Sequence, residues 1–126
     1  MESLNLKGIR GEQQTIVAQK DTAIAYNSGT LEVFATPAMI ALMEKTAMLS
    51  IVDKLPDTST TVGTAVNIEH LKATAVGKHV RCESEIIESE GRRLVFSVKV
   101  FENKTLIGSG THERFIVDIQ KFMLKI

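Results

Sequence analysis

The sequence predicts an α+β fold in which a curved antiparallel sheet of about five strands wraps one long central helix. Two observations predict it. The stretch 35–55, ATPAMIALMEKTAMLSIVDKL, is apolar nearly all round, so a helix there must be buried on most of its surface. Most of the chain after residue 60 alternates between apolar and polar residues, which is the pattern of half-buried strands. A sheet that curves around the helix buries the apolar surface of both.

The central helix has recognisable start and stop signals. Thr36 is expected as its N-cap, because the hydroxyl can accept a hydrogen bond from an amide of the first turn. Pro37 follows at the first helical position, where a missing N–H is tolerated. The run Leu55-Pro56-Asp57 marks the end of the helix.

Glu44 is the unusual residue of this helix. A helical wheel at about 100° per residue puts it in the middle of the most apolar face, opposite a polar side that carries Thr46, Ser50, Asp53 and Lys54. An unpaired carboxylate in apolar surroundings destabilises a fold by several kcal/mol. We therefore interpret Glu44 either as a working acid, base or nucleophile, or as a structural residue that reaches water or a buried ion-pair partner.

The strands follow from the alternation. A weak pattern over 12–25 indicates a first strand, and 61–69 indicates a second, in which Gly63 suggests that backbone approaches another group closely. An irregular crossover at 70–77 follows. Three further strands are expected to form an antiparallel meander, at 78–89, 92–103 and 106–119.

The chain length fits one domain, residues 1–126. Fifteen Lys and Arg balance fifteen Asp and Glu, so no basic field attracts nucleic acid or an anionic membrane. Cys82 is the only cysteine and cannot form an internal disulfide, and neither a signal peptide nor a membrane span is apparent. We expect a cytoplasmic protein with no nucleic-acid or membrane partner.

Few polar residues remain that can carry chemistry. The histidines are His70 at a strand end, His79 at a strand start and His112 within the last strand, and a lone strand histidine is more often structural than catalytic. None has the spacing of a zinc motif, so no metal and no cofactor are expected. What is left is Thr36, Glu44 two turns further along the helix, and His70, which a wrapped sheet can bring over the same helix.

Four segments occur in a fixed order along the chain: VFATPAMIALME, TVGTAVNIEHLKATAVGKHVR, GRRLVFSVKVFE and IGSGTHERFIVD. Together they resemble the fluoroacetyl-CoA-thioesterase-like branch of the hotdog-fold acyl-CoA thioesterases. The resemblance covers about residues 33–121. It implies a hotdog fold and an enzyme that hydrolyses an acyl-CoA thioester with a small acyl group to the free acid and CoA.

The resemblance also implies roles for five residues. The family's catalytic Thr, Glu and His match Thr36, Glu44 and His70, with the spacing between them reproduced. The glycine that lines the family's acyl pocket matches Gly63, and the arginine of its T-H-E-R segment matches Arg114. These two are therefore the expected substrate-binding residues.

One segment departs from the family pattern. Residues 26–33 are short and carry a single aromatic residue, Tyr26, whereas the fluoroacetyl-specific member has a longer and more aromatic loop before the helix. The resemblance therefore extends to thioester hydrolysis but not to specificity for fluoroacetyl-CoA.

The residue types suit thioester hydrolysis, which needs an activated water or a nucleophile, and donors for the developing oxyanion. Glu44 can act as base or nucleophile, His70 can orient water or transfer a proton, and Thr36 is either a nucleophile or a positioning residue. The alternative is a non-catalytic acyl-CoA-binding or sensing domain on the same fold. Such a domain keeps the pocket but needs no acid/base set, so the presence of all three residues favours the enzyme.

A homodimer is the expected assembly, because hotdog thioesterases of this kind resemble one another in joining their sheets near the active sites. The strand 61–69 is the expected sheet edge, since it is short, β-branched and free of Pro and Lys. A two-fold antiparallel pairing of this strand would bring Gly63 and His70 close to the partner subunit.

Overall fold

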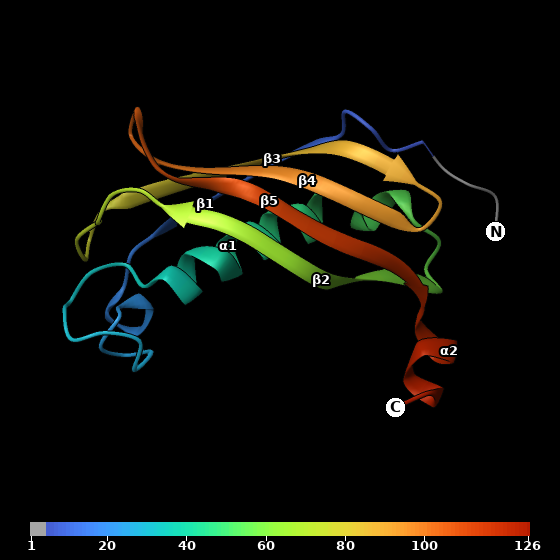
Figure 1. Ribbon diagram of the computed structural model, residues 1–126, viewed down its shortest axis with the longest axis horizontal. Coiled ribbons are helices and arrows are strands. Elements are labelled where there is room, and N and C mark those ends of the chain that lie inside the picture. The colour runs from blue at the N-terminus through green and yellow to red at the C-terminus, as the bar shows by residue number, and fades with distance from the viewer. Residues whose placement is uncertain (1–4) are drawn as a thin grey trace.

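A five-stranded antiparallel sheet curves around helix α1 (Thr36–Ile51) in the computed structural model, which describes residues 5–126 (Figure 1). The strands are β1 (Arg10–Ile16), β2 (Ser59–His70), β3 (His79–Glu90), β4 (Arg93–Glu102) and β5 (Thr105–Asp118). The remaining elements are the short helix α2 (Ile119–Leu124) and the 3₁₀ turns η1 (Gln19–Asp21) and η2 (Val52–Lys54). The predicted α+β fold with a central helix is confirmed.

The strand order β1-β3-β4-β5-β2 makes β3, β4 and β5 a meander and puts β1 and β2 at the two edges. The predicted edge position of the segment 61–69 is thus correct. Residues 63–67 of β2 are exposed, and on its outer side β2 has no strand partner among the described residues. The hairpin turns contain Gly91 and Asn103 with φ of 57° and 54°, the left-handed conformation that tight connections require.

The first predicted strand, 12–25, is wrong beyond Ile16. After β1 the chain folds into η1 and a loop that leads to α1. The weak alternation rested on four apolar residues, of which Ile16, Ile24 and Tyr26 are exposed and Ala18 is half-buried. They therefore do not share a buried sheet face, and the weak pattern carried no strand signal.

The N-cap prediction for Thr36 is also wrong. The N-cap is Ala35, whose φ of −72° and ψ of 141° are extended and which provides no side-chain cap. Thr36 is the first helical residue, so its hydroxyl is free to bond elsewhere. The regular helix ends at Ile51 and tightens into η2, close to the predicted stop.

The buried face of α1 differs from the predicted one. Thr46 is 1% exposed, and the helix side that carries Thr46 and Ser50 packs closely against β1. A Cβ at Gly11 of β1 would lie only 2.6 Å from Ser50 Cβ and 3.1 Å from Thr46 O. These small side chains let helix and sheet approach closely, so Glu44 lies on a half-buried flank and not at the centre of the buried face.

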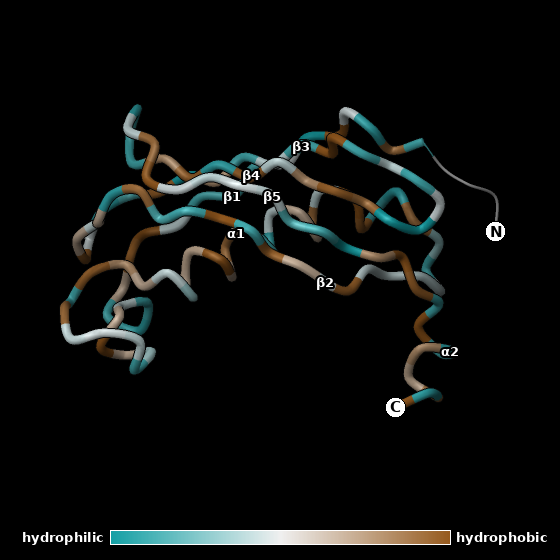
Figure 2. Tube along the Cα trace, viewed as in Figure 1, coloured by the Kyte–Doolittle hydropathy of each residue, from teal (hydrophilic) through white to brown (hydrophobic). Residues whose placement is uncertain are grey.

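The core fills the space between α1 and the concave face of the sheet. Its largest fully buried side chains include Phe96, Met39, Met43, Leu94 and Ile107. Figure 2 shows hydrophobic and hydrophilic residues alternating along the strands, as one buried and one solvated sheet face require. No helix among residues 5–126 is both long and apolar enough to cross a membrane.

Candidate active site

Thr36 and His70 meet at the N-terminal end of α1. Thr36 Oγ1 and His70 Nδ1 are 2.8 Å apart and share a hydrogen bond. The backbone explains this meeting, because the segment before α1 is tied to the segment after β2: Phe34 N donates to Thr74 O at 2.8 Å. The Phe34 ring then packs edge-on against the imidazole, with centroids 6.4 Å apart.

His70 is held in its neutral form. Burial lowers the pKa of its imidazole below the usual 6.5, and the backbone of Lys72 opposes this shift. Nε2 is buried and makes no hydrogen bond of normal geometry to residues 5–126. At neutral pH the ring is therefore uncharged, as a proton acceptor or a neutral donor must be.

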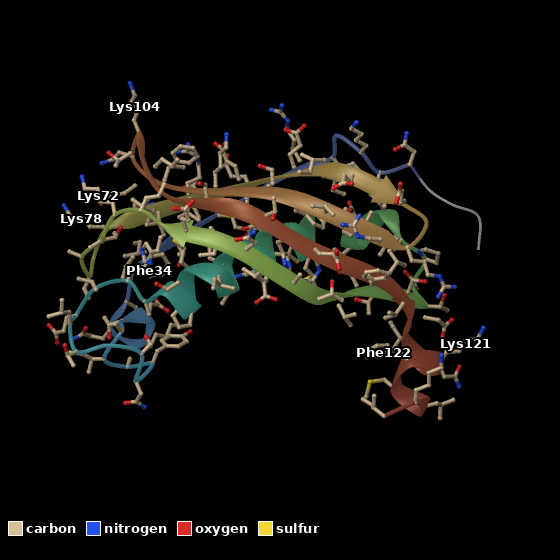
Figure 3. All side chains as sticks on the ribbon, viewed as in Figure 1. Phe34, Lys72, Lys78, Lys104, Lys121 and Phe122 are labelled. Carbon is tan, nitrogen blue, oxygen red and sulfur yellow. The ribbon has the colours of Figure 1, made fainter. Side chains whose placement is uncertain are left out.

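A pocket of about 360 Å³ opens beside this pair. Its walls are formed by Phe34, which precedes α1, by Thr36 and Pro37 of its first turn, and by His70 and Lys72 from the end of β2 and the following loop. Figure 3 shows Phe34 at the start of α1, and Lys72 and Lys78 projecting from the same end of the molecule. The pocket thus combines an apolar wall, the Thr36/His70 pair and a nearby cation.

A second polar cluster lies further along the helix, where Glu44 faces Gly63 of β2. A Cβ at Gly63 would lie 2.9 Å from Glu44 Oε2, 3.1 Å from His112 Cε1 and 3.4 Å from Arg114 Nη1. The missing side chain of Gly63 therefore makes room for three polar groups at one point. The structure confirms the prediction that another group approaches the backbone closely at Gly63.

Arg114 is fixed by two partners, Thr61 on the neighbouring strand β2 and His112 on its own strand β5. Its Nε donates to Thr61 Oγ1 at 2.8 Å, and Nη2 donates to Thr61 O at 3.0 Å. Its Nη1 lies 3.1 Å from His112 Nε2. Burial lowers the pKa of Arg114, and the negative charge of nearby Glu44 opposes this. Arg114 therefore points from the sheet towards Glu44, and Thr61 holds the opposite side of its guanidinium.

His112 was not among the predicted site residues. It is 1% exposed, and Nδ1 lies 2.9 Å from Ala65 O. One signal could have revealed it: His112 and Arg114 are two residues apart on one strand, so their side chains point to the same face of the sheet. If Arg114 is a site residue, its neighbour on that face is a candidate too.

The predicted residues thus form two groups within one chain. Thr36 and His70 form one, and Glu44, Gly63 and Arg114 form the other. Glu44 lies eight residues beyond Thr36, which is about 12 Å along the helix axis, so the two side chains do not meet. Among residues 5–126 no three His, Cys, Asp or Glu side chains are grouped so that they could hold a metal ion.

The sequence matches the model of a family described as FlK, the fluoroacetyl-CoA-specific thioesterases, over residues 17–120. The chain belongs to this family. A fluoroacetyl-CoA thioesterase from Streptantibioticus cattleyicolor is 38% identical to it over 95 residues, which make up 75% of this chain and 68% of the relative.

Solved structures agree. The structure of the fluoroacetyl-CoA thioesterase FlK superimposes with a TM-score of 0.88 at 32% identity, covering 98% of this chain and 96% of that chain. Variants of FlK have been solved with fluoroacetate and CoA, and with acetyl-CoA. A Thermus thermophilus protein described as a thioesterase superfamily member has a TM-score of 0.87 at 26% identity, covering 94% of this chain and 88% of that one. The prediction of a hotdog-fold thioesterase of the FlK family is confirmed.

Proposed function

We propose that this thioesterase hydrolyses CoA thioesters of small acyl groups to the free acid and CoA. The observation that carries the proposal is the Thr36/His70 hydrogen bond beside a pocket at the helix N-terminus. Backbone amides at a helix N-terminus and a positioned hydroxyl are suitable donors for the oxyanion of a thioester reaction. The ligands of the FlK variants, fluoroacetate with CoA and acetyl-CoA, support a small acyl group.

We further propose that the complete site is shared by two copies of the chain. Thr36 and His70 lie about 12 Å along the helix from Glu44 of the same chain, too far to act on one thioester carbonyl. The open edge of β2 offers a way to bring Glu44 of the partner subunit close, because unpaired strand edges pair with another chain unless they are protected. The active unit is then a homodimer.

We propose a register for this pairing. Across a two-fold axis, the numbers of two opposite residues add to a constant. Gly63 of one copy lies opposite His70 of the other when the axis passes between Val66 and Asn67, which are both exposed. In this register Glu44, beside Gly63, approaches the Thr36/His70 pair of the other copy. Each dimer would contain two such sites.

The roles follow from the surroundings of each residue. Glu44 takes a proton from a water whose oxygen attacks the acyl carbon, the carbon–sulfur bond breaks, and the proton passes to the departing thiolate of CoA. Thr36, held by His70, positions the thioester oxygen beside the helix N-terminus. We assign Thr36 as a positioning residue and not a nucleophile, since its hydroxyl lies beside the helix N-terminus, where the oxyanion of the thioester would form.

Lysine side chains suit the CoA end of the substrate. Lys72 lines the pocket, and Lys78 projects nearby (Figure 3). Both can attract phosphate groups at the pocket mouth. The single, buried Cys82 suits a reducing compartment, so we propose a cytoplasmic location.

The test is release of free CoA thiol from a panel of acyl-CoAs that includes acetyl-, fluoroacetyl- and longer acyl-CoAs. Cys82 does not disturb this assay, because burial raises the pKa of its thiol to about 11. We expect turnover of the small acyl-CoAs, and a fall in kcat of about 100-fold for His70→Ala, the scale for a misplaced catalytic group, because Thr36 loses the partner that holds it. Tight binding without thiol release would instead identify a binding or sensing domain.

A further inference from the structure

We infer that His112 is a positioning residue of the reaction: its neutral ring aims the Arg114 guanidinium at Glu44, so that Arg114 and Glu44 together hold the attacking water. The inference rests on the proposed role of Glu44 as the base. His112 itself touches neither substrate nor water. It acts through Arg114.

The hydrogen bonds of His112 determine which nitrogen carries the proton. Arginine only donates, so Nε2 must accept the bond from Arg114 Nη1 at 3.1 Å. The ring proton is then on Nδ1, which donates to Ala65 O at 2.9 Å. His112 is thus a neutral acceptor with one tautomer set by its two partners.

The sheet is built to hold this tautomer. The register of β2 against β5 shifts between Gly63 and Ala65, which leaves Thr64 as the extra residue of a β-bulge. Thr64 turns outward and bonds to Glu113 at 2.8 Å. Ala65, on the other side of the bulge, supplies the carbonyl for His112. A bulge at this point fits the known tendency of bulges to direct groups beside active sites.

The guanidinium has donors left for a ligand. Thr61 accepts two of its five N–H groups, and a third goes to His112. The other two, one each on Nη1 and Nη2, have no acceptor among residues 5–126. Because Thr61 and His112 hold the group at three points, the direction of these two donors is fixed as well.

The limits on the distance between Arg114 and Glu44 leave room for one bridging oxygen atom. Glu44 Oε2 and Arg114 Nη1 lie 2.9 Å and 3.4 Å from the same point, so their separation is at most about 6.3 Å, yet they form no direct ion pair. Two hydrogen bonds of about 2.8 Å that meet at one oxygen span about 4.5–5.5 Å. A water held in this way gives one proton to Glu44 while Arg114 stabilises the hydroxide that forms.

The charged groups that face the His112 ring are Arg114, on the same strand, and Glu44, on α1. Burial lowers the pKa of His112, the charge of Arg114 lowers it further, and the bond to Ala65 and the charge of Glu44 oppose this. Protonation of the ring would remove the acceptor for Nη1 and place two cations side by side. The arrangement therefore needs the neutral ring.

Two amide variants separate positioning from packing. His112→Gln can present an acceptor near the position of Nε2, whereas His112→Asn can keep only the bond to Ala65 near the position of Nδ1. His112→Phe removes both bonds. Each amide variant loses one hydrogen bond, so a purely structural role predicts similar stability and similar activity for the two.

We expect His112→Asn and His112→Phe to lose about 10- to 100-fold in kcat, the scale for a misplaced catalytic group, with KM changed less than about threefold. His112→Gln should stay within about fivefold of the parent. If His112→Gln is as impaired as His112→Phe, or if His112→Asn keeps the parental kcat while Glu44→Gln is inactive, the inference on His112 is wrong and the proposed function stands. If Glu44→Gln itself keeps the parental kcat, the proposed role of Glu44 and this inference both fall.

A second measurement needs no variant to be active. The ¹⁵N spectrum of the parent, with the His112 signals assigned by their loss in His112→Gln, should show Nδ1 protonated and Nε2 unprotonated at neutral pH. A ring protonated on Nε2 would overturn the inference, because that nitrogen could not accept from Arg114.

Discussion

Gly63→Ala should reduce activity far more than stability. The new Cβ would lie 2.9 Å from Glu44 Oε2, about half an ångström closer than ordinary contact. The nearest neighbour is the end of a flexible side chain, so the carboxylate can move away, while the His112 ring, at 3.1 Å, must move by only a few tenths of an ångström. The φ of Gly63 is not in the left-handed region. We expect the free energy of unfolding to change by less than about 1 kcal/mol, since alanine also removes the entropic penalty of a strand glycine.

Activity depends on the position of that carboxylate. A misplacement of about 1 Å at a catalytic group can cost about 100-fold in rate, so a shift of half that size predicts a loss of about tenfold in kcat/KM. The assay is thiol release from the best small acyl-CoA, read beside the midpoint of chemical denaturation. The expected pattern is a clear kinetic defect in a protein of nearly parental stability.

Gly11→Ala is the matched control. Its Cβ would meet Ser50 Cβ at 2.6 Å and a backbone oxygen of α1 at 3.1 Å, neither of which can swing aside, and it lies away from both site clusters. It should destabilise the fold by about 1–3 kcal/mol while the folded fraction keeps its kcat. Equal kinetic losses in the two variants, or parental kinetics in Gly63→Ala, would refute the close contact between Gly63 and a working Glu44.

Three further predictions concern charge and assembly. Glu44→Gln should be inactive yet as stable as the parent or more so, because a half-buried carboxylate is retained for function; a variant that is both active and unstable would make Glu44 structural. Folding lowers the pKa values of His70 and His112, so below pH 6.5 the unfolded chain binds more protons than the folded one. The free energy of unfolding should therefore fall as the pH drops towards the folded-state pKa values. His70→Ala should flatten this dependence, and an unchanged slope of the free energy of unfolding against pH would contradict the burial of that ring. Sedimentation equilibrium should give about twice 13.9 kDa at micromolar concentration, whereas a fully active monomer would exclude the shared site.

The strands were predictable because alternation over ten or more residues has a direct physical cause, the two faces of a sheet. Strands β3, β4 and β5 begin and end within about one residue of their predicted limits. The loop after Ile16 was not predictable, because isolated apolar residues on a loop resemble strand alternation over a short span. Only pairing with a second strand distinguishes a true strand from such a loop, and the sequence alone does not show this pairing.

The buried face of α1 shows a different limit. Thr46 and Ser50 are polar by type, which placed them on the solvent side of the wheel, yet they are small enough to let β1 pack against them. Thr46 satisfies its hydroxyl by bonding to Leu42 O at 2.7 Å. Residue size, and not polarity, decided which side of this helix the sheet covers.

The sequence predicted individual site residues but not how they are arranged in space. The family spacing led to Thr36, Glu44 and His70 as one set, and a helical rise of about 1.5 Å per residue already implied that Thr36 and Glu44 are far apart in one chain. His112 was passed over because a single strand histidine has no distinctive pattern. Its role depends on Arg114 and on the carbonyl of Ala65, and these contacts exist only in three dimensions.

Complementation between inactive variants tests the shared site most directly. His70→Ala keeps Glu44, and Glu44→Gln keeps Thr36 and His70, so a mixed dimer contains one site with all three residues if Glu44 comes from the partner subunit. Equal mixing after subunit exchange should restore about one quarter of the parental activity, since half of the dimers are mixed and each has one intact site of two. Mixing His70→Ala with Thr36→Ala is the control and should restore none. No recovery from the first mixture, with subunit exchange verified, would contradict a site built from two chains.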